Sequence, residues 1–94
     1  MDFSQRFRAN NNIILREEDD GAFLFDPKTG NLKYINRSAK DTFLLLNRET
    51  EVSQMIDHLF SLYSDVDREQ IQKDVESFLM ELVENRFISP CEGE

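Results

Sequence analysis

The chain has 94 residues, of which 39% are hydrophobic and eight are phenylalanine, so it can fold as one small domain but is too short for a two-domain enzyme with a large cleft. Its formal net charge of -8 at pH 7 disfavours duplex DNA as a ligand, because such a surface repels phosphates and releases no counterions. No apolar run approaches the roughly 20 residues needed to cross a bilayer, and the first dozen residues lack the apolar core of a secretion signal. We therefore expect a cytoplasmic protein that neither spans nor binds a membrane.

The first half of the chain predicts a three-stranded antiparallel sheet. Gly21 is expected to adopt a positive φ in the first turn, and Pro27 and Gly30 mark the second turn. The expected strands are IILREE at 13–18, AFLF at 22–25 and NLKYI at 31–35. Four consecutive apolar residues indicate that the second strand is central and buried on both faces. The third strand then forms an edge with unpaired backbone groups, and alternation alone leaves open which of its faces points inward.

The second half predicts three helices. Ser38 with Asp41 resembles a capping pair for a helix that ends near Asn47, Ser53 is the expected cap of the second helix, and Asp67 begins the third. Pro90 prevents the third helix from continuing beyond Ser89.

The third helix carries more apolar surface than a single core contact requires. A stripe at helical spacing consists of Ile71, Val75, Phe78 and Leu82, and it is extended round one side by Leu79, Met80, Val83 and Phe87. This extra surface either packs against the first two helices, the N-terminal segment or a second copy of the chain, or forms an exposed wall beside the open strand. An exposed wall of this kind would suit an extended peptide that adds to the edge of the sheet.

The residues that usually carry chemistry are isolated. Cys91 is the only cysteine and His58 the only histidine, and the acidic run Glu17 to Asp20 lacks the spacing of a calcium loop. Metal sites and activated nucleophiles need several such groups together. We therefore predict no catalytic residue, no metal site, no cofactor and no enzymatic activity.

Three segments together resemble the PqqD family, the small winged helix-turn-helix proteins of pyrroloquinoline quinone biosynthesis, and the wider class of RiPP precursor recognition elements. They are GAFLFDPKTGNLKYINRSAKDTFLLL at 21–46, VSQMIDHLFSLY at 52–63 and DVESFLMELVENRFI at 74–88. Many relatives have a Cys-Asp-Gly-like turn after the first helix, where this chain has Asn47-Arg48-Glu49. The resemblance implies an α+β, winged helix-turn-helix-like fold of three antiparallel strands followed by three helices. It would occupy residues 13–88, between a flexible N-terminal arm (1–12) and a disordered tail (89–94).

The resemblance also implies a function. Proteins of this class bind the leader region of a ribosomally made precursor peptide by β-strand addition and present it to a maturation enzyme, often a radical S-adenosylmethionine enzyme. Carried onto this sequence, the peptide-binding residues would be Asn31, Leu32, Lys33, Tyr34, Ile35 and Asn36 on the third strand, with Gln72, Glu76, Leu79, Met80 and Val83 on the last helix.

Two other functions stay open. One is a winged-helix DNA-binding protein, which the acidic last helix disfavours because a groove-binding helix needs basic side chains. The other is a structural subunit that dimerises through the open edge. We expect a monomer or a weak homodimer without a nucleic-acid partner. The sequence leaves open the precursor, the enzyme and the final product.

Overall fold

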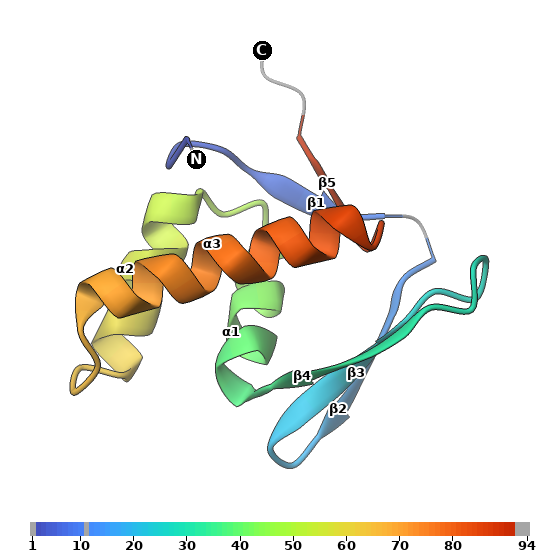
Figure 1. Cartoon of the computed structure of the whole chain (residues 1–94), viewed down its shortest axis with the longest axis horizontal. Helices are drawn as coiled ribbons and strands as arrows, with labels where there is room; N and C mark the ends of the chain where they lie inside the picture. Colours follow the sequence, from blue (N-terminus) through green and yellow to red (C-terminus); the bar gives the residue numbers. More distant parts are fainter. Residues whose placement is uncertain (1, 11, 92–94) are drawn as a thin grey trace.

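The computed structural model describes residues 2–10 and 12–91 and contains a three-stranded sheet, three helices and a separate two-stranded ribbon (Figure 1). The elements in chain order are β1 (Phe7–Ala9), β2 (Ile14–Glu18), β3 (Gly21–Phe25), β4 (Leu32–Asn36), α1 (Arg37–Leu46), α2 (Val52–Leu62), α3 (Arg68–Glu84) and β5 (Ile88–Pro90). Strands β2, β3 and β4 are antiparallel with β3 in the centre, and β1 pairs with β5. The predicted α+β arrangement of three antiparallel strands followed by three helices is confirmed.

The sheet buries one face. Ala22 and Leu24 of β3 are fully buried, and Ile35 of β4 lies on the same face with 3% of its surface exposed. Phe25, on the opposite face, is 37% exposed. Strand β3 is central, as predicted, but the expectation that both of its faces are buried is wrong for the described part of the chain.

Gly21 is required by close packing. A Cβ atom at this position would lie 2.1 Å from the carbonyl oxygen of Ile35 and 2.7 Å from the hydroxyl of Tyr34. Among the described glycines, the positive φ belongs to Gly30, at 82°. Glycine is thus required at position 21, but the predicted reason, a positive φ, is wrong. The close approach of β4 leaves no room for a side chain there.

The helix starts follow capping chemistry, with two shifts from prediction. Asn36 caps α1, and its side chain accepts a hydrogen bond of 2.9 Å from the backbone N–H of Ala39. Glu51 caps α2, and its backbone N–H donates to the side chain of Gln54 at 3.2 Å. Ser38 and Ser53, the expected caps, lie inside the first turns of these helices. Helix α3 begins after Asp67, as predicted.

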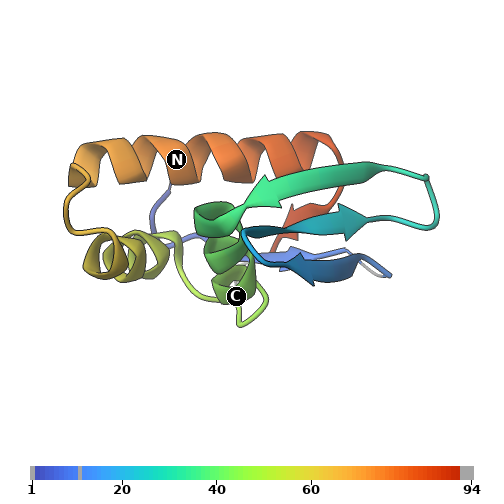
Figure 2. The same ribbon diagram turned by 90° about the horizontal axis from the view of Figure 1, so that it is seen from below.

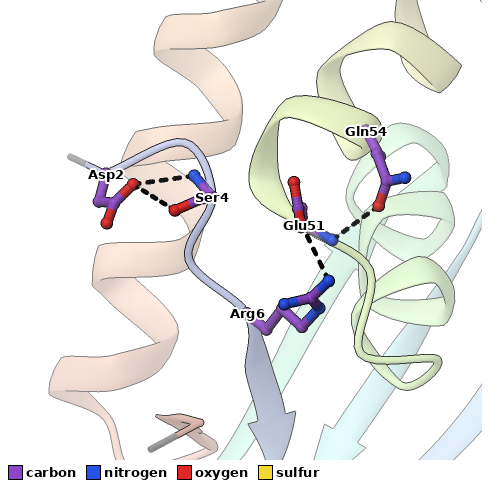
Figure 3. A network of polar contacts seen from close by, with 5 residues as sticks. All are labelled: Asp2, Ser4, Arg6, Glu51 and Gln54. Carbon is purple, nitrogen blue, oxygen red and sulfur yellow. Dashed lines mark hydrogen bonds and ion pairs between the residues drawn. The ribbon is translucent and has the colours of Figure 1, made fainter. Parts of the chain in front are cut away.

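The N-terminal segment is anchored on the start of α2. The first backbone N–H groups of a helix lack partners within it; here Val52 donates to the carbonyl of Gln5 at 3.0 Å and Ser53 to that of Phe3 at 2.9 Å. Figure 3 shows the side chains around this junction, where Arg6 forms an ion pair of 3.0 Å with Glu51.

The β1–β5 ribbon joins the two ends of the chain. Cys91 N–H donates to the carbonyl of Arg6 and Asn10 N–H to that of Phe87, which extends the ribbon at both ends. Phe7 is 4% exposed and belongs to the core. The segments expected as a flexible arm and a disordered tail thus each contribute a strand. Residues 1, 11 and 92–94 of these segments lie outside the described residues, and the division into arm, domain and tail stays a prediction.

Helix α3 passes over the gap between the ribbon and the sheet, which both lie on the same side of it in Figure 2. In Figure 1 the β1–β5 ribbon lies above the helix and the sheet below it, and Figure 2 shows β4 as the strand of the sheet nearest to α3. Ile71, Val75, Leu79 and Leu82 point from α3 into the core. None of the described helices combines the length and the apolarity needed to cross a membrane.

Replacing Gly21 with alanine should destabilise the fold by about 1–3 kcal/mol, because the new methyl group overpacks the β3–β4 contact. The measurement is urea unfolding followed by circular dichroism. Gly30→Asn is the matched control, since Gly30 has open space around it and asparagine tolerates a positive φ. Equal stability of the Gly21→Ala variant and the parent would show that β3 and β4 lie further apart than described.

Candidate functional site

Strand β4 has an open backbone edge. Its one neighbouring strand in the described part of the chain is β3. The backbone N–H of Asp26 donates to the carbonyl of Asn31 at 2.9 Å, which makes Asn31 a hydrogen-bonded position of the antiparallel ladder. Such positions alternate, so Lys33 and Ile35 bond to β3, whereas the N–H and C=O groups of Leu32 and Tyr34 point away from it. These outward groups are a template for a further strand.

Helix α3 runs beside this edge and is linked to it by two polar contacts. The ammonium group of Lys33 forms an ion pair of 2.6 Å with Glu81. The side chain of Asn31 donates to the carbonyl of Asn85 at 3.2 Å. Lys33 and Ile35 therefore face α3 and the core, while Leu32 and Tyr34 face the outside of the sheet. The structure settles which face of β4 points inward.

A cleft of about 490 Å³ opens beyond the Lys33–Glu81 pair. It lies between the start of α1, the end of α2 and one flank of α3, with apolar side chains and a partly polar rim. The lining residues are Asn36, Ser38, Ala39, Thr42, Leu59, Tyr63, Val66, Ile71, Asp74, Val75, Ser77, Phe78 and Glu81. Because Asn36 ends β4 and Glu81 contacts Lys33, the cleft is continuous with the strand edge.

The residues predicted on the strand and on the helix fall in different places. Asn31 precedes β4, and the other five predicted strand residues make up β4 itself. The five predicted helix residues are not among those that line the cleft: Leu79 is fully buried in the core, Met80 is 50% exposed, and Gln72, Glu76 and Val83 are partly buried.

The rotation of α3 explains this difference. At about 100° per residue, Asp74 and Asn85 lie within roughly 40° of Glu81, on the flank that faces β4. By the same geometry Gln72 and Val83 lie roughly 160–180° from Glu81. Leu79 and Val83 pack against the core of the molecule. For these two residues the first alternative, packing within the protein, is therefore correct, and they do not form an exposed wall.

Sequence reasoning missed Glu81 as the α3 residue that contacts the edge strand and Asp74 as a residue that lines the cleft. It assigned Phe78 to the core stripe alone. The signal was present in part, because Asp74, Phe78 and Glu81 recur at helical spacing on one flank of α3. The sequence did not reveal that the β1–β5 ribbon packs against α3. Each strand of the ribbon has three residues, which is too few to show a hydrophobic periodicity.

The two tyrosines have altered acidity. Tyr63 lines the cleft and donates its hydroxyl to Asp41 at 3.0 Å. Partial burial raises the pKa of Tyr63, and the hydrogen bond and negative charge of Asp41 raise it further. Tyr34 on β4 donates to Asp20 at 3.1 Å; loss of hydration first, and then this bond, raise the pKa of Tyr34.

No group of three or more His, Cys, Asp or Glu side chains suited to a metal ion occurs within residues 2–10 and 12–91.

Comparison with known proteins identifies a family and two similar folds. The family model described as coenzyme PQQ synthesis protein D (PqqD) matches residues 21–88. No curated protein sequence matches the chain. The structure of TbiB1 in complex with the TbiA(beta) leader peptide has a TM-score of 0.80 at 20% identity, covering 92% of this chain and 99% of that one. The structure of lasso peptide synthetase B1 complexed with the leader peptide has a TM-score of 0.80 at 25% identity, covering 90% and 99%.

Both tyrosines should ionise above their ordinary pKa of 10.0. Because folding raises these pKa values, their contribution to stability is present below pH 10.0 and is lost as the pH rises through the folded-state values. The chain has two tyrosines and no tryptophan, so tyrosinate absorbance against pH measures them directly. In a Tyr34→Phe background, Asp41→Asn should shift the Tyr63 midpoint down towards 10.0; an unchanged midpoint would contradict the Tyr63–Asp41 contact.

Proposed function

Because this chain belongs to the PqqD family, we propose that it binds the leader region of a ribosomally synthesised precursor peptide and presents it to a maturation enzyme. The observation that carries the proposal is the open backbone edge of β4 beside the cleft. The two similar structures support it, since each was solved with a leader peptide bound.

The leader adds to the sheet as a strand beside β4. Its backbone bonds to the outward N–H and C=O groups of Leu32 and Tyr34, within the peptide-binding segment Asn31–Asn36. Backbone bonds of this kind are independent of the guest sequence. Selectivity then comes from the guest side chains, which alternate between the inner side, towards the cleft, and the outer side of the sheet.

The cleft receives the inward side chains of the leader. Ile71, Val75 and Phe78 supply apolar surface, and Asp74 with Glu81 supplies negative charge at the rim. The Lys33–Glu81 pair lies at the junction between the edge and the cleft, and the side chain of Glu81 is 51% exposed. An ion pair this exposed contributes about 0–1 kcal/mol, so a guest can displace it at little cost.

The proposed role is delivery, without chemistry by this chain itself. We place it in the cytoplasm, where precursor peptides are synthesised, and propose a radical S-adenosylmethionine enzyme as the class of maturation enzyme. The net charge of -8 opposes the alternative of DNA binding. The cleft-lining flank of α3 also carries Asp74 and Glu81, where a groove-binding helix would need cations.

Tyr34→Pro should weaken leader binding about tenfold or more, because proline removes the outward N–H that the guest strand accepts from. Tyr34 does not bond to β3, so an edge proline there is compatible with the fold. Tyr34→Ala is the matched control, since it loses the ring but keeps the N–H. The measurement is isothermal titration with the precursor leader, together with the unfolding midpoint of each variant. Equal affinity of the two variants would exclude strand addition at this position.

Phe78→Ser should weaken leader binding about tenfold, since a buried aromatic contact contributes about 1.5 kcal/mol or more. Met80→Ser, two residues along and outside the cleft, should leave affinity unchanged. Fluorescence anisotropy with a labelled leader peptide measures both. Loss of binding in the Met80→Ser variant alone would favour the helix wall expected from sequence over the cleft.

A further inference from the structure

The outer face of the sheet carries two rows of large side chains that cross all three strands. Strand register places Ile14, Phe25 and Leu32 in one row and Arg16, Phe23 and Tyr34 in the next. We call these six residues the outer face. Ile14 is 50% exposed and Leu32 63%, and a hollow of about 310 Å³ is lined by Ile14, Arg16, Phe23, Phe25 and Leu32. Single exposed apolar residues are ordinary, but a contiguous patch across a sheet indicates a contact surface.

The outer face is ordered by contacts among its own side chains. The rings of Phe23 and Tyr34 meet edge to face with 5.3 Å between their centroids. The guanidinium of Arg16 lies 5.9 Å from the centroid of the Phe23 ring. Strands favour large side chains in general, yet an exposed apolar sheet face invites aggregation. An exposed apolar face of this kind is expected on a folded protein where a binding partner covers it.

We propose that the outer face docks the maturation enzyme, through an apolar ridge on that enzyme with lysine or arginine at one end. This inference rests on the proposed function. The charge of the chain favours a basic partner. Glu18 ends the outer side of β2, where it pairs with Arg16 at 2.9 Å, and Asp19 and Asp20 add negative charge in the adjoining turn, where Asp20 accepts a hydrogen bond from Tyr34. A basic end on the enzyme would meet this acidic turn favourably, whereas a second copy would bring together two chains of net charge -8.

The outer face is also continuous with the peptide edge. The residues whose backbone groups point outward from the edge, Leu32 and Tyr34, place their side chains on the outer face. A leader strand paired with β4 would therefore add its own outward side chains as a fourth strand of the same face. An enzyme docked there contacts both this protein and the bound leader. The binding of the enzyme and the binding of the leader are therefore coupled, and each increases the affinity for the other.

The test uses the full chain, a precursor leader peptide that it binds and the purified enzyme that modifies that precursor. The double variant Ile14→Lys with Phe25→Ser alters the outer face on β2 and β3, away from the β4 edge. It should bind the leader within about twofold of the parent and bind the enzyme at least about tenfold more weakly. Leu62→Ser is the matched control, because Leu62 is an exposed apolar residue (54%) on α2. Biolayer interferometry with and without saturating leader measures enzyme binding, and the parent should bind the enzyme more tightly with leader present.

The outcomes separate the two proposals. Failure of the parent chain to bind its leader overturns the proposed function. Leader binding by the parent, combined with equal enzyme affinity of parent and double variant, overturns the docking surface alone. Leader binding by a parent that does not bind the enzyme overturns the docking surface and the presentation step of the proposed function, and leaves leader binding standing. Sedimentation equilibrium supplies the remaining outcome: a parent dimer that the double variant converts to monomer would make the outer face a contact between copies and overturn the enzyme assignment.

Discussion

The position of α3 determines whether β4 is an open edge or a covered one. The buried side chains of α3, among them Val75 and Leu82, belong to the core, and the elements that α3 packs against are α1, α2 and β5. These neighbours set the position of the helix relative to β4. Because the core is closely packed, moving the helix would cost free energy. The helix therefore stands beside β4 and is joined to it by the polar contacts of Lys33 and Asn31. The open edge and the cleft are both consequences of this arrangement.

The ends of the chain help to hold that arrangement. Backbone carbonyls of Phe3 and Gln5 satisfy the first donors of α2, a capping role that side chains usually perform. Phe7 is then buried where β1 meets β5. Segments that composition describes as polar and loose thus contribute hydrogen bonds and core volume, because two far-separated pieces of sequence complete each other.

Local signals in the sequence were sufficient for the order of the elements. The turn from Asp26 to Gly30, the alternation in β4 and the start of α3 after Asp67 each depend on residues close together in the sequence, and each was predicted. The caps of α1 and α2 were misplaced because Asn36 competes with Ser38, and Glu51 with Ser53, for the same role. Which flank of α3 faces β4 is decided by all the other contacts of the helix. Hydrophobic periodicity predicts how wide the apolar surface of a helix is, but it does not identify the element that packs against it.

The two faces of β4 divide specificity between two partners in the proposed complex. Lys33 and Ile35 point inward, so the cleft distinguishes one leader from another by the inward side chains that it accepts. Leu32 and Tyr34 point outward, so an enzyme on the outer face meets the same surface whichever leader is bound, plus one added row of guest side chains. That row exists only in the loaded state. A ligand can distinguish two states of a protein only if it has different affinities for them. The added row of leader side chains would give the enzyme a higher affinity for the leader-bound protein than for the empty one.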